Sequence, residues 1–271
     1  ALDPESAKIA AAKHHDPFPV LGRHQKNSRT CIKAYLPYAE SVKLYHNNDL
    51  LNRIEGTDFF EYTTDKEQLP QHYQLAWLDK SGNSHLGYDP YDFPVQLPEF
   101  DQHLFGEGRH WHVYQKLGGH LHTTDGIAGV LFTVWAPNAG RVSVVGDFNR
   151  WDGRCHPMRS LGGGGIWELF IPGLTDGCLY KFEILNRFSN EILVKTDPFG
   201  QQFELRPNTS SIVVKEGGYV WGDEQWLANR IGNNWLHEAM SIYEVHLGSW
   251  RLDNQGNFYN PRPPNNTPNP H

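Results

Sequence analysis

The sequence of 271 residues predicts an all-β protein with two tandem β-sandwich modules of the immunoglobulin type. Three observations lead to this prediction. Short segments alternate apolar and polar residues, 26 glycines and 18 prolines punctuate the chain, and one stretch of sequence recurs about 100 residues later. Because these segments do not alternate with long amphipathic helices, a parallel α/β fold is not expected.

The internal repeat consists of three blocks in the same order. The segment CIKAYLPYAESVKL (31–44) aligns with LFTVWAPNAGRVSV (131–144). Further matched positions are Phe60 with Trp167, Tyr73 with Tyr180, and Asp89 with Asp197. The insertions between blocks fall in turn-rich segments, where extra length costs little. We therefore expect two copies of one module.

The second copy shows the strand pattern most clearly. A period of two places Phe132 and Val134 on one face of a strand, and Leu131, Thr133 and Trp135 on the other. We expect further strands over 141–146, 166–173 and 179–185, with Trp135, Trp167 and Tyr180 in the core. A short helix is expected within 111–119, ended by Gly118 and Gly119.

The domain boundaries follow from composition. We expect the first sandwich over 1–104, the second over 105–228, and the start of a barrel over 229–251, because AMSIYEVHLGSW (239–250) is typical of a buried strand that opens a barrel. The last eleven residues hold five prolines and three asparagines. Since such a composition cannot form a core, 252–271 are expected to be disordered.

Composition also restricts the partners and the compartment. The formal net charge of −7 argues against nucleic acid or an anionic membrane as a partner, and no stretch is long and apolar enough to span a membrane. The three cysteines are odd in number and not closely spaced, which indicates a reduced, cytoplasmic protein. We expect a monomer, and a chain trimmed at its start because it lacks an initiator methionine.

One turn carries an unusual residue. In VVGDFNRWDGR (144–154), Trp151 lies among turn-forming residues that include Gly146 and Asn149. An exposed indole can stack on the C–H face of a sugar ring, while nearby polar groups hydrogen-bond its hydroxyls. The alternative is that Trp151 packs over the edge of its module or against another domain.

Four segments resemble, in order, parts of bacterial 1,4-α-glucan (glycogen) branching enzymes. They are HHDPFPVLGRH (14–24), HLFGEGRHWHVYQKLGGH (103–120), FTVWAPNAGRVSVVGDFNRWDGR (132–154) and MSIYEVHLGSW (240–250). The resemblance implies an enzyme that cleaves an α-1,4 bond and transfers the segment to a 6-hydroxyl, using carboxylates on a (β/α)8 barrel. Only the first barrel strand, 242–247, is recognisable here. Glu244 has no partner carboxylate, so we assign no catalytic residue and expect this chain alone to be inactive.

The resemblance also implies a sugar-binding site. In related glycogen-binding modules, the Trp of the FN-x-W motif is a stacking platform and the Lys of a YKF strand adds a polar contact. The resemblance therefore implies carbohydrate-binding roles for Trp151 and Lys181, with Asn149 beside them. The alternative, and the more usual role for such a residue, is that Lys181 is a solvated strand lysine. A second platform is doubtful because Phe188 is the only aromatic residue in the corresponding region, and Asn208 is slightly displaced from the expected position of a further contact. The first copy has LYHNND (44–49) in place of the Trp motif, which favours a spacer role.

Fifteen histidines raise the question of a metal site. The pairs His110/His112 and His120/His122 could each present two imidazoles on one strand face. Neither a cysteine pair nor a carboxylate cluster lies nearby in the sequence, so we expect no metal and no other cofactor.

Three functions compete at this point. The chain is expected to be the N-terminal module region of a branching enzyme, with α-glucan as ligand and docking to the catalytic barrel within the same protein. The alternatives are a non-catalytic glycogen-binding adaptor and a debranching or trehalose-forming relative. The strand motif SIYEVHLGSW favours the first, since an adaptor has no use for it.

Overall fold

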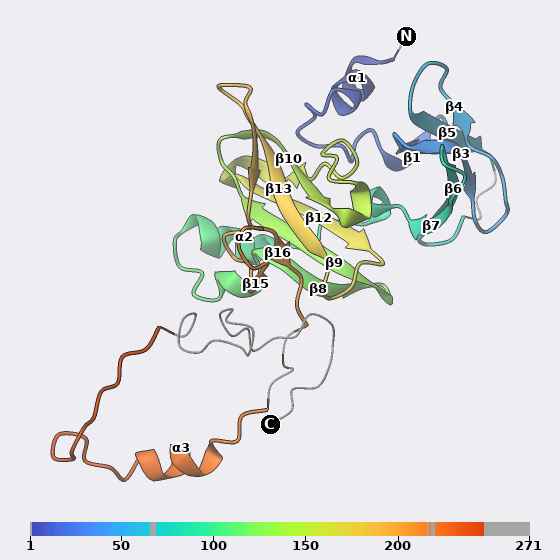
Figure 1. Ribbon diagram of the computed structural model, residues 1–271. Helices are drawn as coiled ribbons and strands as arrows, with labels where there is room; N and C mark the ends of the chain where they lie inside the picture. Colours follow the sequence, from blue (N-terminus) through green and yellow to red (C-terminus); the bar gives the residue numbers. More distant parts are fainter. Residues whose placement is uncertain (1, 66–68, 216, 218–219, 247–271) are drawn as a thin grey trace. The chain divides into compact units, whose positions relative to one another are not determined.

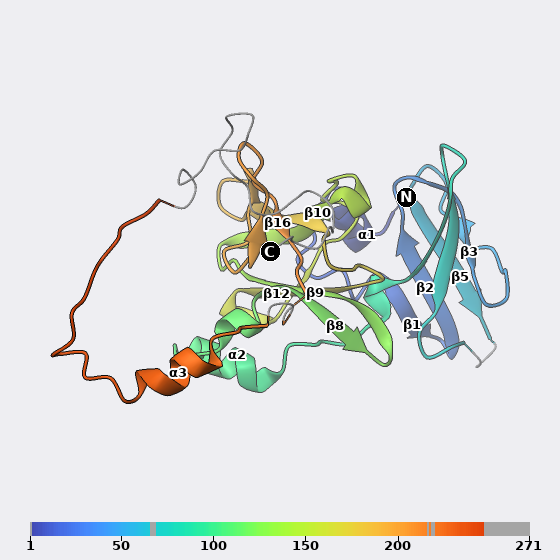
Figure 2. The same cartoon turned by 60° about the horizontal axis from the view of Figure 1, so that its bottom comes forward.

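The computed structural model describes residues 2–65, 69–215, 217 and 220–246 (Figure 1). The described residues up to 215 form one compact unit, and those from 217 onward belong to a second unit. The first unit contains two β-sandwiches, which lie beside each other in Figure 2, with β1, β2 and β5 in one and β8, β9 and β12 in the other. The prediction of an all-β fold with two tandem sandwiches is confirmed.

The first sandwich has two antiparallel sheets. One sheet has the order β1 (Gly22–Lys26), β2 (Arg29–Tyr35), β5 (Phe59–Thr64) and β4 (Asn52–Arg53). The other has the order β3 (Ala39–Leu44), β6 (Gln74–Asp79) and β7 (Ser84–Tyr88). Inward-facing aliphatic and aromatic residues from both sheets fill the space between them, as the period-two pattern requires.

The second sandwich repeats this arrangement and extends it. One sheet has the order β11 (Arg159–Ser160), β12 (Ile166–Pro172), β9 (Ile127–Trp135) and β8 (Gly118–Thr124). The other has the order β10 (Ala139–Gly146), β13 (Leu179–Asn186), β16 (Ser211–Ile212) and β15 (Gln202–Phe203), with β14 (Ile192–Lys195) also paired to β13. The pairings among β1–β7 recur, strand for strand, among β8–β14.

Equivalent polar contacts form at positions that the sequence repeat already matches. The hydroxyl of Tyr73 donates to Asp89, and the hydroxyl of Tyr180 donates to Asp197 at 2.5 Å. Both register shifts between paired strands occur at equivalent places, after Ala39 in β3 and after Ala139 in β10. Two copies of one fold therefore keep the same buried hydrogen bond as well as the same strand order.

Short helical segments connect and flank the strands. They are α1 (Pro4–Ala10), η1 (Pro90–Asp92), α2 (Glu99–Gly106), η2 (Val113–Gln115), η3 (Asp147–Asn149), η4 (Gly162–Gly164) and, in the second unit, α3 (Glu224–Arg230). The helix expected within 111–119 is only the 3-10 turn η2. Gly118 has φ of 108° and begins β8, so the helix cannot continue.

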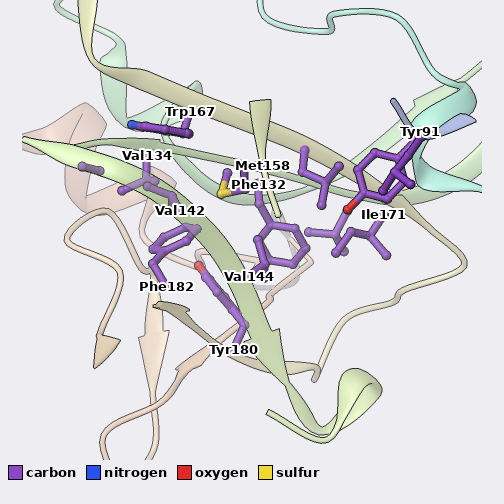
Figure 3. Packing of buried hydrophobic residues seen from close by; sticks show 14 of the residues in the cluster. Tyr91, Phe132, Val134, Val142, Val144, Met158, Trp167, Ile171, Tyr180 and Phe182 are labelled. Atoms are coloured by element: carbon purple, nitrogen blue, oxygen red, sulfur yellow. The ribbon is translucent and has the colours of Figure 1, made fainter. Parts of the chain in front are cut away.

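The apolar core of the second sandwich includes residues from outside the sandwich. Phe132, Val134, Trp167 and Tyr180 meet between the two sheets (Figure 3). The same cluster also contains residues that precede the second sandwich in the chain, namely Ile9 of α1, Leu21, Tyr35, Phe59 and Tyr91. The two sandwiches therefore share apolar packing within one unit, which disfavours free motion between them.

Trp135 differs from its sequence prediction. Trp167 and Tyr180 are buried as expected, but Trp135 is 52% exposed. It is the last residue of β9, and its ring makes an edge contact with Phe105, with ring centroids 5.9 Å apart. Its indole N–H donates to the carbonyl of Gly164 at 3.1 Å.

A buried ion pair holds the connection between the sandwiches. The Glu168 carboxylate, fully buried in β12, accepts from the backbone N–H groups of Gln96 and Leu97 at 3.0 and 2.5 Å. Arg159 lies 3.4 Å from Glu168 and donates to the carbonyl of Phe93. Burial raises the pKa of Glu168. The two backbone N–H donors and the Arg159 guanidinium stabilise the charged form of this buried carboxylate.

The segment expected to open a barrel has no regular secondary structure over 239–246, and Ile242 and Tyr243 are exposed. A strand needs a neighbouring strand to pair with, and no strand of the described part of the chain forms a ladder with this segment. The expected strand end at Leu247 and the tail 252–271 lie outside the described residues. Across the same described part, every helix is too short or too polar to cross a bilayer.

Candidate functional site

The turn that carries Trp151 follows directly from β10. The chain passes from β10 through η3, and then Arg150 and Trp151 both adopt φ of 59°. Consecutive non-glycine residues in the left-handed region are uncommon, and they persist only where surrounding contacts hold them. The Trp151 N–H donates to the carbonyl of Gly146 at 3.0 Å, which closes the turn against the end of the strand.

Asn149 provides most of those contacts. Its side-chain oxygen accepts from the N–H of Gly146, and its amide group donates to the carbonyl of Val144 and to Nδ1 of His156, each at 2.9 Å. Burial lowers the pKa of His156 to about 4, so this imidazole is neutral near pH 7 and its Nδ1 can accept. The sequence predicted a sugar contact for Asn149. In the structure its side chain is buried and engaged with its own turn, because a turn with two left-handed residues needs internal donors and acceptors.

Trp151 itself is anchored at one edge and open elsewhere. Its side chain is 37% exposed, and its indole N–H donates to Oδ1 of Asp147 at 2.8 Å. An aromatic ring held in one orientation loses little conformational entropy when a ligand stacks on it. This geometry is compatible with a ligand stacking on the indole.

Lys181 lies on the outer face of the neighbouring strand, at the same end as the turn. In the β10–β13 ladder, Val145 pairs with Lys181, one position from the Gly146 to which Trp151 is bonded. Lys181 alternates with the buried Tyr180 and Phe182, so its side chain leaves the sandwich on the opposite face. Its ammonium group donates to the hydroxyl of Thr209 at 2.8 Å.

The loop after Trp151 packs rigidly on the outer side of β10. The hydroxyl of Ser143 donates to the carbonyl of Gly153 at 2.6 Å, and Arg141 lies 2.7 Å from Glu183. A Cβ on Gly153 would stand 2.0 Å from the Glu183 carboxylate, so a larger residue here would require that carboxylate to move. The loop behind the platform is therefore tightly packed against the sheet.

Two further residues considered from the sequence lie elsewhere. Phe188 is exposed in the β13–β14 hairpin, beyond Asn186, and five strand positions separate Lys181 from Asn186, about 16 Å at about 3.3 Å per residue. The Asn208 amide donates to Glu204 at 3.2 Å, and its neighbour Thr209 contacts Lys181 instead.

The structure places an aliphatic residue where the second platform was sought. Val194 of β14 pairs with Glu183 and therefore shares the outer face with Lys181. Val194 and Ile192 are both exposed on this face. Alternation in the segment ILVK over Ile192–Lys195 is the signal that could have located them, but a strand of four residues is too short to be recognised from the sequence alone.

Three of the four histidines in these pairs take part in ordinary hydrogen bonds. His110 contacts Asp101 at 2.7 Å, His120 contacts the carbonyl of Leu117, and His122 contacts Gln96. Within the described ranges, no group of three or more metal-ligating side chains comes together.

Each of the two sandwiches matches a known protein family. The family described as alpha-1,4-glucan branching enzyme GlgB, N-terminal domain matches residues 4–91. Carbohydrate-binding module 48 (isoamylase N-terminal domain) matches residues 116–200, which include Trp151 and Lys181.

Curated relatives agree along nearly the whole chain. The 1,4-alpha-glucan branching enzyme GlgB of Methylococcus capsulatus is 53% identical over 261 residues, which is 96% of this chain and 35% of that protein. The proteins of the same name from Cellvibrio japonicus and Nitrosococcus oceani are each 50% identical, over 95% and 94% of this chain and 36% and 34% of their own lengths. The chain thus spans about a third of the length of these relatives. With its two sandwiches matched in order, the chain belongs to the 1,4-alpha-glucan branching enzyme GlgB family and carries the N-terminal domain and the carbohydrate-binding module 48 of that family.

Proposed function

We propose that this chain is the module region of a glycogen branching enzyme and that its second sandwich holds α-glucan at Trp151. The whole enzyme would transfer a cleaved α-1,4-glucan segment to a 6-hydroxyl, with its catalytic carboxylates on a barrel domain. The observation that carries the proposal is the anchored, partly exposed indole of Trp151 within a carbohydrate-binding module.

Binding would combine an apolar face with a polar edge. The C–H face of a glucosyl ring packs on the Trp151 indole, and the Lys181 ammonium and Thr209 hydroxyl hydrogen-bond to sugar hydroxyls. One such platform binds a single ring weakly. A branched polymer offers many chain ends at once, so retention on glycogen exceeds the affinity for a short oligosaccharide.

The remaining parts of the chain have supporting roles in this proposal. The first sandwich acts as a spacer that packs on the second, and both dock onto the barrel of the same protein. We place the enzyme in the cytoplasm as a monomer. The free thiols of Cys31, Cys155 and Cys178 support a reducing compartment, and burial raises the pKa of Cys155 to about 12, which keeps it an unreactive thiol.

Affinity electrophoresis in gels that contain glycogen tests the site. The unmodified chain should be retarded, and Trp151→Ala should migrate as it does in a gel without glycogen. Trp135→Ala is the matched control, because it removes another exposed indole from the opposite sheet of the same sandwich. Equal retardation of Trp151→Ala and the unmodified chain would contradict the proposal, as would equal loss in both variants.

A further inference from the structure

The turn that carries Trp151 is tied to the first sandwich on both sides of the indole. Before it, the Arg150 guanidinium lies 3.1 Å from Oδ2 of Asp79, the last residue of β6, and 4.4 Å from the ring centroid of Tyr38. After it, Oδ2 of Asp152 accepts from the hydroxyl of Tyr38 at 2.6 Å. Both residues that flank Trp151 are therefore held by the neighbouring sandwich.

Asp79 is a rigid partner for the turn, because its own hairpin holds it. It is 2% exposed, and its Oδ1 accepts from two backbone N–H groups of the hairpin between β6 and β7, each at 2.9 Å. Its other oxygen contacts His85 at 3.0 Å and meets Arg150. Tyr38 lies beside it, since the N–H of Lys80 donates to the carbonyl of Tyr38 at 3.0 Å. Both partners are thus fixed at one end of the first sandwich.

The second copy of the fold shows what these two positions need for the fold alone. Asn186 occupies the position of Asp79, because the β10–β13 ladder begins with the same pairing as the β3–β6 ladder. The Asn186 side-chain oxygen accepts from two backbone N–H groups of its own hairpin, at 2.8 and 3.1 Å. Asn138 takes the place of Tyr38 in the aligned sequence. An amide is therefore sufficient for the hairpin, and what Asp79 adds is the charged oxygen that meets Arg150.

These bonds matter because the turn is strained. Arg150 and Trp151 both have φ of 59°, a conformation that non-glycine residues keep only where their surroundings hold it. If the bonds to the first sandwich are lost, the turn can relax and the indole can take other orientations. A ligand that needs one orientation then binds more weakly, in proportion to the fraction of molecules that still hold it.

We propose that Tyr38 and Asp79 are positioning residues for glucan binding, through which the first sandwich holds the turn of the second in the conformation that presents Trp151. This inference rests on the proposed function, since the ligand of Trp151 is the glucan proposed there. It gives the first sandwich a role beyond that of a spacer. Neither residue has to touch the glucan, because each acts through a neighbour of Trp151 in the chain.

Glycogen retention of the full chain gives the first readout. Asp79→Asn keeps the oxygen that holds the hairpin and removes the charge that pairs with Arg150, while Tyr38→Phe keeps the ring and removes the hydroxyl. Because the Arg150 side chain is 51% exposed, its ion pair alone contributes little, so the two changes are combined. Affinity electrophoresis at several glycogen concentrations should show binding weakened by about 3- to 10-fold in the double variant. The matched control is Tyr62→Phe, which deletes a hydroxyl bonded to Asp49 within the first sandwich and should bind normally.

The second readout follows the indole without any glucan. In the chain labelled with ¹⁵N, the indole N–H signal of Trp151 is assigned from its disappearance in Trp151→Phe. This N–H donates to Asp147, so its exchange with solvent, measured by NMR, reports how firmly the indole is held. We expect faster exchange in the double variant and no change in Tyr62→Phe. On an Asp152→Ala background, Tyr38→Phe should add nothing to the exchange rate, because its partner is already gone.

The outcomes separate positioning from direct contact. Faster exchange together with weaker retention supports the inference. Weaker retention with unchanged exchange would overturn it, because Tyr38 or Asp79 would then act on the glucan and not on the turn. Unchanged retention would overturn it whatever the exchange rate. The proposed function fails by a different result, full retardation of Trp151→Ala, on which the exchange rate of the double variant has no bearing.

Discussion

The paired buried tyrosines offer a direct measurement of how the two sandwiches are stabilised. Tyr73→Phe and Tyr180→Phe each delete one hydroxyl and leave the ring in place. Tyr73 is fully buried and donates to the buried Asp89, while Tyr180 donates to the buried Asp197 at 2.5 Å. Each carboxylate keeps one backbone donor, the N–H two residues later in the chain, at 2.9 and 2.8 Å.

The expected cost follows from what each carboxylate loses. A hydrogen bond to a charged group contributes about 1.5–3 kcal/mol, and the deleted hydroxyl leaves a buried acceptor without water to replace it. We expect each variant to lower the free energy of unfolding by about 2 kcal/mol near pH 7.5, a factor of about 30 in the unfolding equilibrium. For a unit of this size the melting temperature should fall by about 4–8 °C.

Urea denaturation followed by circular dichroism measures these changes. Tyr62→Phe is the control, because its hydroxyl donates to Asp49 at 2.7 Å at the edge of the first sandwich, and neither group is buried. There water replaces the lost partner, so the cost should stay below about 1 kcal/mol. If Tyr73→Phe and Tyr180→Phe cost no more than Tyr62→Phe, the reasoning from burial is wrong.

Three further predictions concern pH, binding and aggregation. Burial raises the pKa of Asp89 from 3.8 to about 6, so between these pH values the folded state keeps a proton that the unfolded state has released. The free energy of unfolding should therefore fall by up to about 3 kcal/mol as the pH rises from 4 to 6. Urea titrations at each pH should show this decline in the unmodified chain and not in Asp89→Asn. Val194→Trp adds an indole to the sheet face that carries Lys181, so it should increase retardation in glycogen gels. Val194→Leu, which adds no aromatic ring, should not. Unchanged mobility of the Trp variant would count against this placement of the site. Truncation after Asn229 removes the exposed apolar segment 242–246 and should reduce light scattering on concentration, and equal scattering would contradict that role.

Much of the fold was predictable because local patterns carry it. Strands such as β9 and β12 are long runs of mainly apolar residues with a proline at or shortly after their ends, so their existence follows from composition and turn signals. The duplication was visible because matched residues such as Tyr73 and Tyr180 perform the same buried task. The helix α2 was missed, since its eight residues bury none of their side chains and leave no apolar stripe to recognise.

The site residues were likewise predictable from the sequence only in part. An exposed Trp151 was expected from its turn, and the structure places it there with one edge bonded to Asp147. The inward direction of Asn149 was not foreseeable, because Asn suits both a ligand contact and an internal turn contact in sequence. The same holds for Trp135, whose exposure depends on which segment covers the end of β9.

The sequence by itself determined that this chain forms two related sandwiches, since the period of two and the repeated blocks are local properties of the chain and do not depend on how the modules meet. Only the tertiary structure decided how N-terminal residues such as Ile9 join the second core and how Arg150 of the second sandwich pairs with Asp79 of the first. Those contacts join residues far apart in the chain, and their geometry depends on packing and on buried ion pairs that no periodic pattern encodes.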